Sequence, residues 1–207
     1  MLGPPGAGKG TQADRFARSR QVPRISTGDV LRQARVENAD LDRQARATMD
    51  AGRLVDDDVV IDIVRKRLAE PDARTGFVLD GFPRTLNQAE ALDHLLDGRL
   101  PLVVVDIEVP EETLFERLRT RRVCAKCGTS ATAVLAVCSA CGGALVQRSD
   151  DDLRVVRERL RVYDRESSPI VEFYRRRPTF RSVDGDQLQE SVAADISSAV
   201  ASVLGAR

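Results

Sequence analysis

Apolar residues recur at helical spacing in several stretches of the chain, with short apolar runs between them. The spacing predicts helices over 9–20, 56–69, 85–96, 111–119, 150–177 and 188–204, with a kink or restart at Pro169. The short runs predict strands over 22–25, 77–80, 102–107 and 180–183. Alternating strands and helices indicate an α/β fold, with a parallel sheet and crossover helices.

Two stretches interrupt this alternation. Residues 27–56 begin within a small polar run, Ser26-Thr27-Gly28-Asp29, that caps a helix, and they contain two short predicted helices with little apolar content. Residues 121–148 have no helical period and contain all four cysteines. We therefore expect a core built from residues 1–26, 57–120 and 149–207, with two small insertions that cover it.

The first eleven residues, MLGPPGAGKGT, have the pattern of a phosphate-binding loop. Glycines let backbone N–H groups approach an anion, Lys9 can reach the outer phosphates, and a helix starting near Lys9 adds the positive end of its dipole. The spacing from Gly3 to Lys9 fits G-x-x-x-x-G-K, but Gly10 stands where Ser or Thr is usual and the hydroxyl follows at Thr11. Direct ligation of magnesium by a loop hydroxyl is therefore less strongly indicated. The alternative, a glycine-rich turn with an incidental lysine, is disfavoured because loop and helix start agree.

The start of the chain conflicts with this loop, because only Met1 and Leu2 precede Gly3 where a buried strand is usual. Loss of about four buried aliphatic side chains would cost roughly 6–12 kcal/mol, against a total stability of about 5–15 kcal/mol. The neighbouring strands would also have unpaired edges. We expect a native start upstream, at an earlier codon that encodes a short apolar run. The alternatives are a fold with a gap, or another segment that fills it.

Composition narrows the function classes. The 207 residues contain 32 basic and 32 acidic side chains, so no overall field attracts nucleic acid or a membrane surface. The longest aliphatic run is too short to span a bilayer, and no secretory signal is present, so we expect the cytoplasm. His94 is the only histidine, which disfavours reactions that need a histidine base. Transfer between two phosphate groups needs no such base, since the acceptor is already ionised.

The cysteines form C-x2-C-x10-C-x2-C through Cys124, Cys127, Cys138 and Cys141. Four thiolates that close on Zn²⁺ make a structural site with no open position for catalysis. Two disulfides or free thiols are the alternatives, and an intracellular setting disfavours the disulfides.

Polar residues follow the predicted strands, where ligands bind in open parallel sheets. Asp80 ends an apolar strand, as a magnesium-associated acid does in phosphate-loop enzymes. The alternative roles of Asp80 are a helix cap or a structural ion pair. Arginines recur near strand ends and insertion edges, and their planar forks suit a polyanionic substrate. They are Arg32, Arg84, Arg117, Arg121, Arg148 and Arg159. Any one of them alone could equally be a solvated surface charge.

Together these segments resemble the adenylate kinases, in the bacterial long-lid form with a four-cysteine lid. The resemblance covers essentially the whole chain, through GPPGAGKGTQ, STGDVLR, MDAGRLV, DGFPRTLNQ, RRVC, QRSDDD, VRERL and VDG. It implies a P-loop NTPase-type sheet flanked by helices, an AMP-binding insertion at 27–56 and a zinc-clasped lid at 121–148. It also implies reversible transfer from MgATP to AMP, giving two ADP and maintaining adenine nucleotide balance. The implied cofactors are Mg²⁺ and one structural Zn²⁺. The implied partners are ATP, AMP and ADP, without nucleic acid or membrane, and we expect a monomer.

The resemblance also implies roles for individual residues. ATP would be bound by Gly6, Ala7, Gly8, Lys9, Gly10, Thr11, Arg117, Arg121, Ser130, Ala131 and Gln187. AMP would be bound by Thr27, Arg32, Arg53, Leu54, Val55, Gly81, Phe82, Pro83, Arg84, Gln88, Arg148 and Arg159. Catalysis would depend on Lys9, Arg84, Arg121, Arg148 and Arg159. The lid metal would be held by the four cysteines, and Asp150 and Asp151 would hold the geometry of the lid.

The sequence departs from the family at the lid, where only ten residues separate the cysteine pairs and Ser130-Ala131 lacks an aromatic residue. Gln187 stands where lysine is frequent, which a backbone contact tolerates. A pyrimidine monophosphate kinase is one alternative, but similar enzymes tend to have alanine and asparagine where this chain has Thr27 and Gln88. A nucleic-acid-binding protein is another alternative. It leaves Lys9 and Asp80 unexplained and lacks a basic field.

Overall fold

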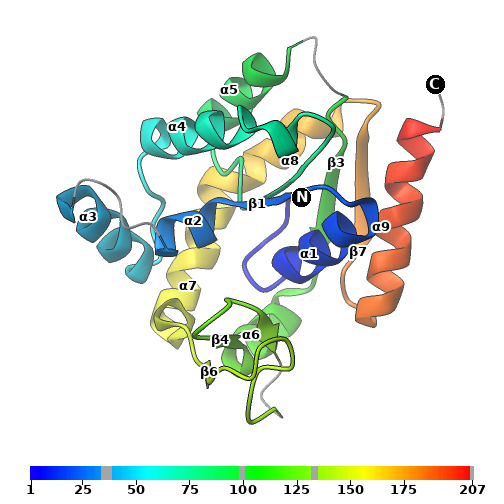
Figure 1. The fold of residues 1–207 in the computed structure, drawn as a ribbon. Helices are drawn as coiled ribbons and strands as arrows, with labels where there is room; N and C mark the ends of the chain where they lie inside the picture. Colours follow the sequence, from blue (N-terminus) through cyan, green and yellow to red (C-terminus); the bar gives the residue numbers. More distant parts are fainter. Residues whose placement is uncertain (34–38, 98–100, 132–134, 206–207) are drawn as a thin grey trace.

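Four parallel strands form the centre of the computed structural model, which describes residues 1–33, 39–97, 101–131 and 135–205 (Figure 1). They are β1 (Arg24–Ser26), β2 (Val78–Asp80), β3 (Val104–Glu108) and β7 (Phe180–Asp184). β1 pairs with β2, and β3 pairs with β7, in both cases in parallel. The predicted parallel α/β fold is confirmed.

The first two residues lie between these two strand pairs. Leu2 donates from its backbone nitrogen to Val105 O at 2.7 Å and accepts from Ile107 N at 3.1 Å. The nitrogen of Met1 donates to Leu79 O at 2.9 Å. As predicted, these two residues stand where a central strand is expected. The expectation of unpaired strand edges is wrong at Val105 O, Ile107 N and Leu79 O, because Met1 and Leu2 supply their hydrogen-bond partners.

Helices connect the strands and cover the sheet. They are α1 (Lys9–Arg20), α4 (Asp57–Leu68), α5 (Leu86–Leu96), α6 (Glu111–Thr120), α7 (Leu153–Val162), α8 (Ser168–Arg175) and α9 (Gln189–Leu204). A short 3₁₀ turn, Pro71–Ala73, follows α4, and another, Ser149–Asp151, precedes α7. No described helix is both long and apolar enough to cross a membrane.

Two predicted boundaries need correction. The helix predicted over 150–177 is interrupted by a π-helical turn, Tyr163–Ser167, before Pro169 enters the first turn of α8. The strand predicted over 22–25 begins only at Arg24. The N–H of Val22 donates to Ala17 O at the end of α1 at 3.1 Å, and Pro23 has no N–H to give to a ladder.

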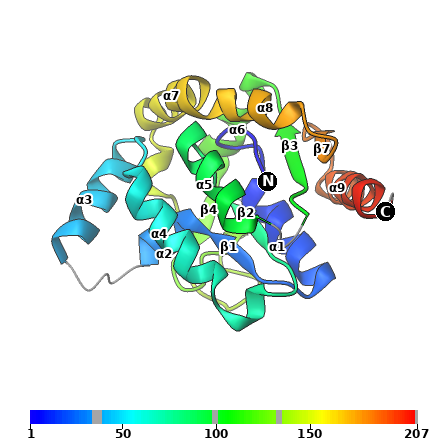
Figure 2. The same cartoon turned by 90° about the horizontal axis from the view of Figure 1, so that it is seen from above.

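Side chains alternate between the two faces of the sheet. Val104 packs in a cluster with α5 and α8, which includes Ile170 and Tyr174. Val105 and Ile107 instead pack against α6, α7 and α9. Figure 2 shows α8 and α1 on opposite sides of the central strands. This period of two explains why a nearly continuous apolar strand is buried on both faces.

The two interrupting stretches lie at different edges of this core (Figure 1). The first contains α2 (Thr27–Gln33) and α3 (Ala39–Asp50), as the prediction of two short helices requires. The second contains a small antiparallel sheet in the order β5-β4-β6, made of Ser130–Ala131, Arg122–Cys124 and Leu145–Val146. Within its described residues it has no helix, in agreement with the missing helical period.

Asp106 is a carboxylate buried in the middle of the sheet. Its residue is 5% exposed, and among the described residues its Oδ1 has no hydrogen-bond partner. Burial above all, and then the charge of Glu108, raise the pKa of Asp106 to about 6. A pKa raised on folding means that stability is present at low pH and is lost as the pH rises from about 4 through 6.

Asp106→Asn should therefore increase the unfolding free energy at pH 8, because no charge is then buried. A net gain of about 1–2 kcal/mol is expected, less than the full pKa shift implies because a buried amide also needs partners. At pH 4 the variant and the wild type should differ little. Urea unfolding at both pH values measures this. A difference between the two proteins that does not change with pH would contradict the assignment.

Candidate active site

The loop between Leu2 and α1 has the backbone shape that its glycines permit. Gly3, Gly6 and Gly8 have φ values of 131°, 90° and 91°, in the region that favours glycine. A Cβ on Gly3 would lie 2.6 Å from the carbonyl oxygen of Ile107. Gly8 is the N-cap of α1, so the loop leads directly to unpaired N–H groups at a helix N-terminus. The predicted anion-binding geometry is present.

Lys9 is folded back into this loop. Its Nζ donates to Gly3 O at 2.6 Å and to Pro4 O at 2.8 Å. Burial above all, and then the charges of nearby arginines, lower the pKa of Lys9 to about 7, although the charge of Asp80 opposes the shift. The site therefore has a surplus of positive charge that a polyphosphate would neutralise.

Asp80 ends β2 beside the first turn of α1. Its Oδ2 accepts from Arg24 Nη2 at 2.7 Å and from Nε at 3.3 Å, so the ion pair considered as its alternative role is present. Within the described residues, the polar contacts of this carboxylate all use Oδ2, which leaves Oδ1 as a hard oxygen for Mg²⁺ or its waters. A Cβ on Gly10 would lie 3.2 Å from that Oδ2, so a side chain at this position would crowd the carboxylate.

Arg84 lies where the segment after β2 turns back. Its Nε donates to Gly81 O at 2.9 Å, and Thr27 Oγ1 donates to the same oxygen at 2.9 Å. Burial lowers the pKa of Arg84 from its ordinary value, as expected for a cation that has no direct carboxylate partner among the described residues. The arginine is therefore poised for an external anion.

Arg84 borders a pocket beside the first insertion. The pocket is lined by Thr27, Gly28, Leu31, Met49, Arg53, Leu54, Val55, Val60, Gly81, Arg84 and Gln88. Seven of these residues were expected at an AMP site. The sequence analysis did not assign Gly28, Leu31, Met49 or Val60, whose only signal was apolar spacing or, for the glycine, position beside Thr27.

Gln88 is 1% exposed at the wall of this pocket. Its Oε1 accepts from the backbone N–H of Arg84 at 2.8 Å, and its Nε2 donates to Asp57 Oδ1 at 2.6 Å. A backbone N–H can only donate and a carboxylate can only accept, so the orientation of the amide is fixed. One N–H and one lone pair remain for a ligand.

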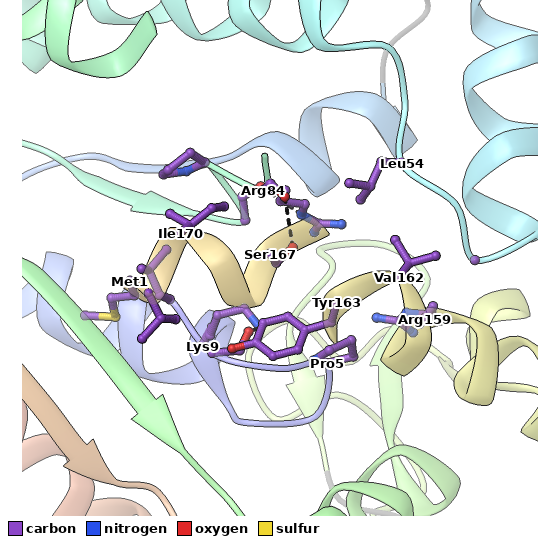
Figure 3. A pocket seen from close by; sticks show the side chains of 16 residues that line it. Met1, Pro5, Lys9, Leu54, Arg84, Arg159, Val162, Tyr163, Ser167 and Ile170 are labelled. Carbon is purple, nitrogen blue, oxygen red and sulfur yellow. Dashed lines mark hydrogen bonds between the residues drawn. The ribbon is translucent and has the colours of Figure 1, made fainter. Parts of the chain in front are cut away.

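A second pocket adjoins the phosphate loop (Figure 3). Lys9, Pro5, Arg84 and Arg159 line it from different elements. Sequence reasoning also missed residues here: Val162, Tyr163, Ser167, Ile170 and Val171. Their helical spacing predicted packing, and nothing in it showed a π-helical turn here or that Tyr163 lies beside the loop. Ser167 Oγ donates to Arg84 O at 2.9 Å and ties this turn to the arginine.

Two adjacent aspartates hold three of the predicted arginines. Arg121 forms a two-bond pair with Asp151, and Arg148 bonds Asp150 through Nε at 2.8 Å and Nη2 at 2.5 Å. Arg159 Nη1 lies 3.1 Å from Asp151 Oδ1 and 3.2 Å from Asp150 Oδ2. Although burial opposes it, the charges of Arg159 and Arg148 lower the pKa of Asp150 to about 2. Three cations share two carboxylates, so the group has a net positive charge beside the pocket.

Other predicted residues lie outside the two pockets. Arg117 Nη2 donates to Gly185 O at 2.9 Å, two residues before Gln187, so these two residues expected to bind ATP are neighbours. Ser130 and Ala131 pair with Val123 and Arg122 in the lid sheet and line neither pocket. Arg32 bonds Asp29 at 2.5 Å at the edge of the insertion. Phe82 is buried and lines neither pocket, whereas its neighbour Pro83 does line the pocket beside the loop.

The four cysteines converge in the lid. Their Sγ atoms all lie within 4.8 Å of one another and none is in a disulfide, so the two-disulfide alternative is not realised. A Cβ on Gly143 would lie 2.8 Å from Cys124 Sγ, so this glycine lets the second turn approach the first. The set fits a metal ion that prefers four thiolates.

A glycine loop and a second pocket that share an arginine are the arrangement of a class, the P-loop phosphotransferases that act on nucleoside monophosphates. A model of the family described as Adenylate kinase matches residues 1–179. Adenylate kinases of Clostridium acetobutylicum and Moorella thermoacetica are each 47% identical to this chain, covering 95% and 97% of it and 95% and 96% of their own lengths. The Archaeoglobus fulgidus adenylate kinase is 46% identical over 204 residues, 95% of this chain and 94% of its own. The chain belongs to the adenylate kinase family.

Proposed function

We propose that this protein transfers the terminal phosphoryl group of MgATP to AMP, reversibly, giving two ADP. The observation that carries the proposal is the shared wall between the two pockets, since Leu54, Gly81 and Arg84 line both. A donor phosphate in the loop and an acceptor phosphate beside Thr27 would meet at Arg84. Such placement is what in-line phosphoryl transfer requires.

The residues of the chain would act by position and charge. Loop N–H groups and Lys9 would hold the donor phosphates, and Arg84 would contact the acceptor. Arg159, with Arg121 and Arg148 close by, would stabilise negative charge on the transferred group. The acceptor phosphate is already ionised, so no general base is needed. Mg²⁺, bound near Asp80 with the donor, would neutralise phosphate charge.

We further propose that residues 27–56 and 121–148 cover the AMP and ATP sites, respectively, over a core of 1–26, 57–120 and 149–207. A contact between the edges of the two insertions supports this arrangement. Ser149 Oγ, directly after the lid, donates to Asp50 Oδ1 at the end of α3 at 2.7 Å. The two covers would therefore meet over the transferred group.

A coupled assay with purified protein, MgATP and each of AMP, UMP, CMP and GMP tests the reaction. Two ADP per AMP consumed is the expected stoichiometry. Absence of ADP formation with AMP would refute the proposal. UMP turnover comparable to that of AMP would support the pyrimidine kinase alternative.

We propose that the lid binds one Zn²⁺ through Cys124, Cys127, Cys138 and Cys141. Because the binding energy of a structural site is folding energy, chelation should lower the melting temperature more than it lowers kcat at low temperature. Differential scanning calorimetry with and without a chelator, beside kcat at 15–20 °C (about the range where the folded state is most stable), measures both effects.

Cys124→Ser should reproduce the lower melting temperature without a chelator, which separates loss of the site from other effects of chelation. Elemental analysis that finds no metal in purified, reduced protein would contradict the zinc proposal. So would a chelator effect of equal size in the variant.

A further inference from the structure

Arg24 lies between two carboxylates that come from different elements. Its Nη2 is 2.7 Å from Asp80 Oδ2 and 2.9 Å from Asp29 Oδ2. One nitrogen therefore bridges the end of β2 and the first turn of α2. The Asp80 side chain is only 10% exposed, so this carboxylate depends on a cation close by.

This bridge lies against the phosphate loop. A Cβ on Gly10 would meet Asp80 Oδ2 at 3.2 Å and Arg24 Nη2 at 3.3 Å, so both atoms touch the first turn of α1. The same turn begins with Lys9. Arg24 thus adds a permanent positive charge at the place where a metal ion would accompany the donor phosphates.

The bridge also satisfies the second carboxylate. Asp29 Oδ1 accepts from Arg32 Nη2 at 2.5 Å, and Asp29 Oδ2 accepts from Arg24 Nη2. If Arg24 were removed, Asp29 Oδ2 and Asp80 Oδ2 would lose the cationic group that lies between them. Two carboxylate oxygens in that position are the arrangement that a divalent ion bridges.

We propose that Arg24 is a positioning residue, a built-in counter-ion that holds Asp80 and competes with divalent metal for its carboxylate. Metal then binds at this strand end mainly when nucleotide phosphates supply further ligands. This inference rests on the proposed use of metal nucleotides, but it concerns metal affinity and does not depend on which monophosphate is phosphorylated.

Arg24→Gln tests the inference, because glutamine keeps a donor and removes the charge. Mn²⁺ is the probe, and electron paramagnetic resonance reports free Mn²⁺ both in nucleotide-free protein and in its complex with a non-hydrolysable ATP analogue. Arg24 contacts the carboxylate that would hold the metal, so removal of its unit charge should lower the dissociation constant of Mn²⁺ at least about tenfold. Arg24→Lys keeps the charge and should remain within about threefold of wild type.

Arg67→Gln is a matched control. Arg67 also forms a two-bond pair, with Asp72 at 2.8 Å and 2.7 Å, at the end of α4. Its loss should leave Mn²⁺ affinity unchanged. Melting curves of all variants establish that each one is folded.

Asp29→Asn provides a second test if Arg24→Gln does not fold. In this variant Arg24 keeps Asp80 as its one charged partner of the two, so it should compete more strongly with Mn²⁺ for Asp80 and weaken Mn²⁺ binding. Three outcomes would overturn the inference: an Arg24→Gln affinity within twofold of wild type or weaker, an Arg24→Lys affinity equal to that of Arg24→Gln, or unchanged or tighter binding in Asp29→Asn. No phosphoryl transfer is measured, so failure of the proposed reaction would be seen separately.

Discussion

Lys9→Met should lower kcat by roughly 10²–10³ or more, about 3–4 kcal/mol, as loss of one preorganised charge-stabilising donor usually does. The structure also predicts that the variant folds. Nζ of Lys9 contacts the carbonyl oxygens of Gly3 and Pro4, and the close partner of Asp80 is Arg24. Methionine fills a similar volume and leaves no buried carboxylate without its partner.

The comparison needs a lysine outside the site. Lys66 forms an exposed pair with Asp62 at 2.8 Å on α4, so Lys66→Met should leave kcat unchanged. Single-turnover measurements with MgATP separate the chemical step from nucleotide binding. If Lys9→Met retained activity within about threefold of wild type, the phosphate-loop assignment would be wrong.

AMP should be preferred over UMP and CMP by at least ~10³ in kcat/KM, because a site built to hydrogen-bond one base edge rejects a base that leaves its groups unpaired. Gln88 offers one N–H and one lone pair, the pattern that matches the acceptor and donor of an adenine edge. Uracil has its donor and acceptor in the opposite order, so the Gln88 amide would have to flip to bind it. A flip would break the bonds to Asp57 and to the Arg84 backbone.

Gln88→Leu should therefore reduce kcat/KM for AMP by roughly 10²-fold, through loss of two ligand hydrogen bonds and of the donor that Asp57 Oδ1 accepts from. The value for UMP should change much less. Asn87→Ala is the matched control, since Asn87 also bonds Asp57, at 3.2 Å, but is exposed. Equal losses for AMP and UMP would show that Gln88 supports the fold of the pocket and does not select the base.

Features encoded locally were predictable from the sequence. The glycine loop, the helix from Lys9 to Arg20 and the cysteine cluster each depend on residues close together in the chain, and the structure confirms all three. The strand start at Arg24 was missed because it depends on how the end of α1 uses the N–H of Val22.

Features that depend on register between distant segments were not predictable. The Arg24–Asp80 pair follows from the alignment of β1 with β2, in which Ser26 lies opposite Asp80. Tyr163 lines the pocket as the first residue of a π-helical turn between α7 and α8, and residue spacing alone does not show such a turn. Apolar pocket residues such as Met49 have the same pattern as core residues, so only their three-dimensional position distinguishes them.

The lid begins and ends at arginines that are anchored to neighbouring carboxylates. Arg121 holds Asp151 and Arg148 holds Asp150, both within the single turn Ser149–Asp151. The entry and the exit of this segment are thus fixed to one point, independently of the number of residues between them. We therefore expect that a change in the number of residues between Arg121 and Arg148 leaves Arg159 in place, since Arg159 is bonded to the same two aspartates.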